Sequence, residues 1–313
     1  AYEIRLRLVG SEMCIRDRTA WAALMACTSA QAIDVEAGDY TAAPDGTTLG
    51  LIYLQHADRQ ASYADGSKTP AHGHMRSDVG VLRLIHFMKL GDYIVDPQFL
   101  LPFGHLRGTG DFQSLGSNGG LGDLTLAATL WTINDPVNRR YLGFTPFVYA
   151  PTGSYSRNEA LNMGENRWKY AFQVGYIQGL GRFFTVDLLA DVTLHGRNAD
   201  YGAAGQSFKQ DPTYQLQAFG RYQVTPALDL RVGVAKSWVG STQVDGLEAA
   251  GRGQVTKSTV GVGYQLDART QLLALYGRDL KVTEGLKEKH RINLRVAYAC
   301  LLYTSPSPRD VEE

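Results

Sequence analysis

The sequence contains very little cysteine and no long apolar run. Its three cysteines, Cys14, Cys27 and Cys300, all lie near the ends of the chain. A disulfide framework or a thiolate metal site in the body of the chain is therefore excluded. No apolar segment approaches the ~20 residues that a transmembrane helix requires. The 31 basic and 31 acidic residues give a net charge of zero, which does not indicate nucleic-acid binding.

The two ends of the chain do not continue the patterns next to them. Residues 1–18 and 300–313 resemble translated sequencing-adapter read-through, so we exclude both from the fold argument. Without them, residues 33–299 are expected to form one domain, and this domain has no cysteine.

Residues 19–32 form an uncharged apolar run that ends in the small-x-small triplet Ala-Gln-Ala. This pattern is typical of a secretory signal peptide, here truncated at its basic start, with cleavage before Ile33. An alternative is a lipoprotein signal in which Cys27 would be acylated and retained. Either reading predicts export.

The interior of the chain alternates apolar and polar residues with a period of two. Even-numbered apolar residues share one face in residues 291–298, 184–194, 214–222 and 168–176, and polar residues share the other. Helical spacing would mix the two sets, so the pattern predicts β-strands. Twelve such runs are expected, near residues 47–57, 76–89, 92–104, 121–133, 141–151, 166–178, 183–195, 213–224, 228–239, 255–266, 270–280 and 290–299.

Short and long connections alternate between these strands. The long ones are polar and rich in Gly, Ser, Asn and Asp. Outer-membrane barrels have short periplasmic turns and longer outer loops, and an even strand count places both termini on the periplasmic side. The sequence therefore predicts an all-β fold, a transmembrane antiparallel up-and-down β-barrel; a soluble β-sandwich is the alternative, but it does not predict this alternation. The long connections are residues 58–75, 105–120, 152–165, 196–212, 240–254 and 281–289.

Charged residues on the polar faces are expected to point into the barrel lumen, because a charge on the lipid face costs about 2–4 kcal/mol at the bilayer midplane. They predict a polar, water-filled path; the alternative is a plugged barrel in which acids and bases satisfy one another. The residues are Asp96, Asp123, Arg167, Lys169, Asp187, Asp191, Arg221, Arg231, Lys257, Arg291 and Arg295.

Aromatic residues near the strand ends predict two belts at the membrane interfaces. The alternative is that they pack the core of a sandwich. The proposed girdle consists of Trp131, Tyr141, Trp168, Phe184, Tyr222, Trp238 and Tyr264.

Four motifs together resemble one family across residues 33–299. They are IDVEAGDYTAAPDGTTLGLIYLQHADRQASYADG from Ile33, GLGDLTLAATLW from Gly120, FTPFVYAPTGSY from Phe144 and NMGENRWKYAFQVGY from Asn162. The chain resembles the outer-membrane proteins of the meta-pathway of phenol degradation family. The resemblance implies a barrel that passes aromatic or other hydrophobic compounds. One departure is that such proteins end on an aromatic residue, where Cys300 stands here.

Enzyme and metal motifs are weak in this sequence. His72 and His74 form no metal clip without a third ligand, and the glycine-rich residues 116–120 lead into a strand rather than a phosphate-binding helix. His195, with Ser207 or Ser237 as partner, is the alternative of an outer-membrane lipid hydrolase, but no sequence context singles out a nucleophile. No catalytic, cofactor-binding or metal residue is therefore assigned, and no cofactor is implied.

The function predicted from the sequence is a bacterial outer-membrane channel for passive uptake of small aromatic or hydrophobic compounds. The alternative is a structural or adhesive barrel without an open pore. The expected partners are the lipid bilayer, those solutes and the barrel-assembly machinery, with no nucleic acid.

Overall fold

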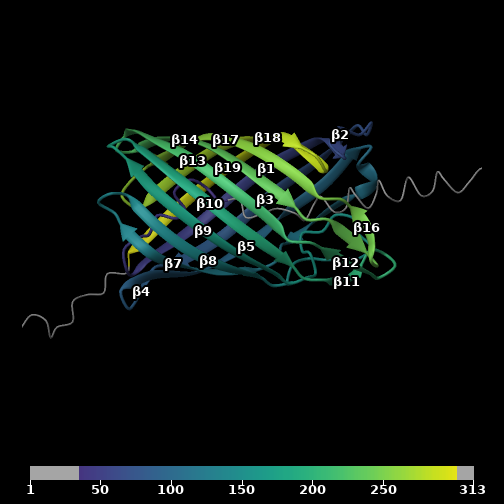
Figure 1. Ribbon diagram of the computed structural model, residues 1–313, viewed down its shortest axis with the longest axis horizontal. Helices are drawn as coiled ribbons and strands as arrows, with labels where there is room; N and C mark the ends of the chain where they lie inside the picture. The colour runs from purple at the N-terminus through teal and green to yellow at the C-terminus, as the bar shows by residue number, and fades with distance from the viewer. Residues whose placement is uncertain (1–34, 302–313) are drawn as a thin grey trace, which may run out of the picture.

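The computed structural model describes residues 35–301, which fold as a barrel of antiparallel strands (Figure 1). The only helical element in this range is the 3-10 turn η1 (Gln113–Leu115). The twelve long strands are β1 (Thr47–Ala64), β3 (Gly73–His86), β5 (Tyr93–Gly110), β7 (Thr125–Asp135), β8 (Arg140–Tyr149), β9 (Lys169–Leu180), β10 (Phe184–His195), β13 (Thr213–Thr225), β14 (Leu228–Val239), β17 (Gly253–Gln265), β18 (Thr270–Val282) and β19 (Gly285–Leu301).

The barrel closes because its last strand pairs with its first. Each long strand pairs with the next one along the chain, and β19 pairs antiparallel with β1, with Val296 opposite Ile52. The predicted fold class and strand count are confirmed. Pairing continues through Leu301, so Cys300 lies opposite Thr48 within β19, beyond the expected end of the domain at residue 299. The expected signal peptide, residues 19–32, lies outside the described part of the chain.

The strands form a barrel that is polar inside and apolar outside, as lipid requires of a membrane barrel. Odd-numbered side chains such as Asp187, Asp191 and Gln217 are buried in the interior, whereas even-numbered Leu188 and Leu216 on the same strands are about half exposed on the outer wall. No helix among residues 35–301 is long and apolar enough to cross a membrane.

The two rims of the barrel differ in the length of their connections (Figure 1). The short turns lie at the end where β4 (Met88–Leu90) is labelled. At the opposite end, β2 (Ser67–Lys68), β6 (Ser117–Leu121) and a separate four-stranded sheet extend the structure. That sheet consists of β11 (Asn198–Tyr201), β12 (Gln206–Gln210), β15 (Thr242–Val244) and β16 (Leu247–Ala250).

One predicted long loop is wrong. Residues 281–289 were expected to form an outer loop, but β18 continues to Val282 and β19 begins at Gly285. Glu288 is buried in the barrel, where it forms an ion pair with Arg291 of the same strand. Because the interior of this barrel is polar, a stretch of charged residues can belong to a strand as well as to a loop.

Candidate functional site in the barrel lumen

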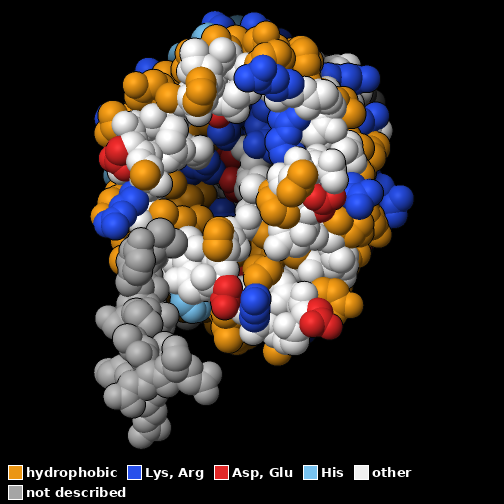
Figure 2. Space-filling model, turned by 90° about the vertical axis from the view of Figure 1, so that its left-hand side faces the viewer, with side chains coloured by type: hydrophobic (Ala, Val, Ile, Leu, Met, Phe, Trp, Pro, Cys, Tyr) orange, Lys and Arg blue, Asp and Glu red, His pale blue; other side chains and the backbone are white. Residues whose placement is uncertain are grey.

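Residues 35–46, the described residues before β1, run into the barrel, and we call them the inner segment. Ala37 and Tyr40 are 3% and 5% exposed, in a buried cluster with Trp131, Ile177 and Leu189 of the barrel wall. Seen from the short-turn end, the molecule is hollowed, and charged side chains lie in the hollow (Figure 2). The inner segment therefore narrows the passage from within.

Tyr40 fixes the inner segment to one wall of the barrel. Its hydroxyl lies 2.8 Å from Thr145 Oγ1 and donates to Gln173 Oε1 at 3.0 Å. The indole Nε1 of Trp131 donates to the Tyr40 carbonyl oxygen at 2.9 Å. The hydroxyl and the backbone carbonyl of Tyr40 thus give hydrogen-bond partners to buried polar side chains, which would otherwise lower the stability of the fold.

Asp39 and the backbone of the inner segment contact charged side chains of the barrel wall. Arg295 Nη1 donates to Asp39 Oδ1 at 2.7 Å, and Arg83 Nη1 lies 3.3 Å from Asp39 Oδ2. The amide of Gly38 donates to Asp187 Oδ2 at 2.6 Å, and Arg231 Nη1 donates to the Ala37 carbonyl at 2.6 Å. Wall charges on opposite sides of the lumen therefore hold this segment.

The two carboxyl groups of the inner segment have different environments. Burial alone would raise the pKa of Asp39, but Arg295 and Arg83 outweigh burial and hold that pKa below its usual range. For Glu36, burial outweighs the lowering effect of Arg295 and raises the pKa to about 7. Asp39 thus anchors the segment as an anion, whereas Glu36 changes its charge near neutral pH.

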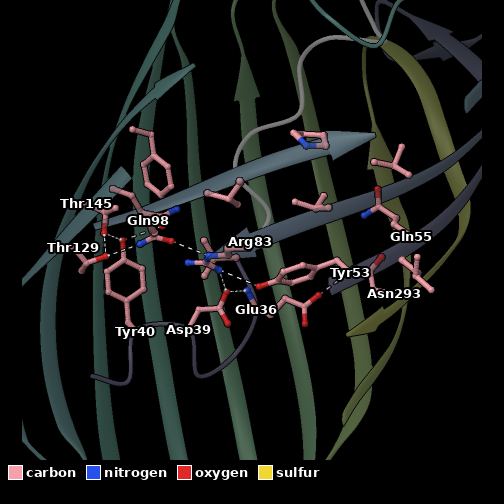
Figure 3. A pocket seen from close by; sticks show the side chains of 18 residues that line it. Glu36, Asp39, Tyr40, Tyr53, Gln55, Arg83, Gln98, Thr129, Thr145 and Asn293 are labelled. Atoms are coloured by element: carbon pink, nitrogen blue, oxygen red, sulfur yellow. Dashed lines mark hydrogen bonds and ion pairs between the residues drawn. The ribbon is translucent and has the colours of Figure 1, made fainter. Parts of the chain in front are cut away.

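A cavity of about 250 Å³ lies between the inner segment and the wall. Figure 3 shows its labelled polar side chains in a band, from Tyr40, Thr129, Thr145 and Gln98 through Asp39, Arg83 and Tyr53 to Glu36 and Asn293. Apolar side chains complete the lining, among them Val79, Val81, Leu100, Pro102 and Phe147. The cavity can therefore hold a ligand with an apolar body and a polar group.

A second cavity, of about 210 Å³, lies nearer the long-loop rim. Glu165 lines it and accepts hydrogen bonds from Lys169 Nζ and from Arg167 Nη2, the latter at 2.7 Å. Burial would raise the pKa of Glu165, but Lys169 and Arg167 lower it to about 2. Beside this cavity, Leu106, Phe112, Leu115 and Leu161 form a buried apolar cluster that covers part of the rim.

Every charged residue predicted to face the lumen is buried or half-buried in the barrel, and most take part in ion pairs. Their role in a transport path stays a prediction. Those buried are Asp96, Asp123, Arg167, Lys169, Asp187, Asp191, Arg231, Arg291 and Arg295, and those half-buried are Arg221 and Lys257.

Two of the predicted girdle residues are wrong. Trp131 and Tyr141 are 1% and 5% exposed and pack in the interior around the inner segment. Both lie near strand ends, which is why they were predicted to be in the girdle. Their side chains point inward, however, because they are odd-numbered residues of β7 and β8. Of the others, Trp168, Phe184, Tyr222 and Tyr264 are exposed and Trp238 is half-buried.

The enzyme and metal alternatives gain no geometric support. His195 Nε2 lies 3.2 Å from Thr213 Oγ1, and Ser237 instead accepts from Gln215 at 3.2 Å. His74 Nδ1 lies 3.1 Å from Asp58 Oδ1. Within residues 35–301 there is no group of three His, Cys, Asp or Glu side chains placed to hold a metal ion.

The inner segment was missed from the sequence, although two glycines carried a signal. A glycine inside a strand often marks close approach by another part of the chain. A Cβ at Gly175 would lie 2.3 Å from the Tyr40 ring, and one at Gly143 would lie 2.9 Å from it. The missing side chains in β9 and β8 therefore make the seat for Tyr40.

A substitution at Gly175 tests whether this site holds Tyr40 and the inner segment. Gly175→Ala is expected to push Tyr40 out of its site and to raise the ionic conductance of the barrel, because its Cβ would overlap rigid ring atoms. Gly50→Ala is the matched control, since a Cβ there meets nothing within 4 Å. Conductance in planar bilayers measures both, and equal values for Gly175→Ala and wild type would contradict the proposed seat.

Comparisons with known proteins agree with this architecture. The family model described as "Putative MetA-pathway of phenol degradation" matches residues 58–295. An outer membrane channel from Pseudomonas putida F1 is 40% identical, with a TM-score of 0.82 over 85% of this chain and 100% of that one.

Other solved barrels are more distant. The beta domain of the Bordetella autotransporter BrkA is 12% identical, with a TM-score of 0.48 over 81% of this chain and 100% of that one. A mutant of the TodX monoaromatic hydrocarbon channel is 9% identical, with a TM-score of 0.47 over 83% and 91%. None of the curated proteins matches the sequence. From the family model and the 40% identical channel, the chain belongs to the family described as the MetA-pathway of phenol degradation.

Proposed function

We propose that this protein is a channel of the bacterial outer membrane that admits small aromatic or hydrophobic compounds by passive diffusion. The observation that carries the proposal is the closed barrel with a charged interior and a cavity of mixed polarity beside the inner segment. The family and the 40% identical outer membrane channel support the same class of function. Cleavage of the leader and insertion by the barrel-assembly machinery are part of the proposal.

The inner segment lines the larger of the two cavities, and the second adjoins it toward the long-loop rim, because Val79 and Pro102 line both. In its docked position, Asp39 is paired with Arg83 and Arg295, which come from β3 and β19. Transport therefore requires the solute to pass beside the segment or the segment to move. The proposed channel has a narrow resting state rather than a wide pore.

Conductance and solute flux test the proposal together. The purified full chain, reconstituted in planar bilayers, is expected to give discrete current steps that added phenol reduces, because phenol would occupy the cavity in the ion path. Vesicles containing the protein should also take up phenol faster than protein-free vesicles. A folded barrel with neither current nor accelerated uptake would favour the structural or adhesive alternative instead.

A further inference from the structure

We infer that the cavity beside the inner segment binds neutral single-ring aromatics through a hydroxyl group, and that Glu36 is the residue that selects for this hydroxyl. The inference deepens the proposed function and rests on it, because it names the ligand chemistry of the same lumen. It comes from two oxygen atoms at the edge of the cavity.

These oxygens belong to buried or half-buried groups and lack hydrogen-bond donors. Glu36 is 7% exposed, and its Oε1 accepts from Asn293 Nδ2 at 3.3 Å. Glu36 Oε2 and Asn293 Oδ1 make no hydrogen bond within the described part of the protein. A buried acceptor without a donor lowers the stability of the folded protein, and more so if it is charged. A ligand that donates a hydrogen bond here would recover that stability.

The rest of the cavity fits an aromatic ring. Val79, Val81, Leu100 and Phe147 line it together with the ring of Tyr53. An engineered apolar cavity of about 150 Å³ in another protein binds benzene. The 250 Å³ available here therefore accommodates a single ring with its substituent, and the free oxygens lie at the polar edge.

The same edge disfavours anionic aromatics. Arg83, the guanidinium that lines the cavity, already donates to Gln98, Tyr53 and Asp39. A benzoate placed in the cavity would bring a second carboxylate next to Glu36, and it would not gain an ion pair with Arg83 in return. Like charges brought together in a partly desolvated site repel each other. We therefore expect selection for a hydroxyl donor and against a carboxylate.

Equilibrium binding to the purified full chain in detergent tests the inference, with phenol, toluene and benzoate as probes. At about pH 8.5, above the pKa of about 7 of Glu36, that carboxyl is ionised, phenol keeps its proton and benzoate has lost its own. Phenol is expected to bind roughly ten-fold more tightly than toluene, the ratio given by one hydrogen bond of about 1.4 kcal/mol. Benzoate is expected to bind more weakly than both, because its carboxylate and that of Glu36 repel each other.

Two variants of Glu36 separate recognition from folding. Glu36→Leu should abolish the preference for phenol over toluene, because it removes the acceptor and keeps a similar volume. Glu36→Gln should strengthen benzoate binding, because the amide removes the repulsion and can donate. Glu159→Gln, on an exposed loop, is the matched control and should behave as wild type.

The outcomes separate this inference from the proposed function. Equal affinities of wild type for phenol and toluene would overturn the inference, as would a phenol preference that survives in both Glu36 variants. If vesicles accelerate phenol uptake in either of those cases, the proposed function stands without this site. Selective binding without any uptake would overturn the channel and leave the binding site.

Discussion

A variant lacking residues 35–43 is expected to conduct ions several-fold better than the wild-type barrel. The deletion removes Asp39 and Tyr40, and with them the side chains that cross the lumen between β3, β8 and β19. It leaves Asp45, which accepts from the amide of Lys89 at 2.9 Å, and Gly46, whose amide donates to Phe87. The start of β1 therefore keeps its local contacts while the lumen widens.

Single-channel recording in planar bilayers measures this effect, and heat modifiability on gels checks that the barrel still folds. A double variant, Asp39→Ala with Tyr40→Ala, is expected to show an intermediate conductance because the backbone of the segment remains. A folded deletion variant with unchanged conductance would show that the inner segment does not limit the path.

Replacement of Glu288 by leucine is expected to lower the free energy of unfolding by about 3 kcal/mol. The Glu288 carboxylate lies 2.9 Å from Arg59 Nη2 and 2.6 Å from Arg291 Nε, and Lys257 Nζ lies 3.8 Å away. Glu288, Arg59 and Arg291 have side chains less than a tenth exposed. Removing the carboxylate leaves clustered cations in a buried site, which is costly because their mutual repulsion is poorly screened.

Equilibrium denaturation in detergent micelles, with Glu159→Gln as the control, measures the loss of stability. Glu288→Gln should lose nearly as much as Glu288→Leu, since both remove the charge. A loss below about 1 kcal/mol is the value typical of exposed ion pairs. It would show that water screens this part of the lumen, contrary to the burial on which the prediction depends.

The sequence predicted the barrel well because a membrane strand repeats one simple rule. Residues 184–194 alternate so regularly that the strand predicted at 183–195 matches β10 within one residue, whereas the strand predicted at 290–299 misses the first residues of β19. Failures came where a residue's face or partner depends on the assembled barrel. Trp131 lies near a strand end but faces inward, and residues 285–289, predicted as part of a loop, belong to β19 and pair with β1.

The site was harder to predict because it joins residues far apart in the chain. The contact between Glu36 and Asn293 spans 257 positions and that between Tyr40 and Gln173 spans 133. Alternation along a strand shows which residues face inward, but it does not show which free segment they bind. The glycines at 143 and 175 indicate that another part of the chain approaches these strands closely, but the sequence does not show that this part is the Tyr40 ring.

The direct continuation of the inner segment into β1 at Thr47 makes any movement of the segment away from the wall an intramolecular event. Once displaced, the segment remains tethered to its own binding site at a high effective concentration, set by a few residues of chain. Rebinding is then independent of protein concentration, and a solute that contacts Glu36 in the cavity would favour the docked position. Under the proposed function, the equilibrium between docked and released segment would set the time a channel spends open, so a mutation that weakens docking slightly would change flux without altering the width of the barrel.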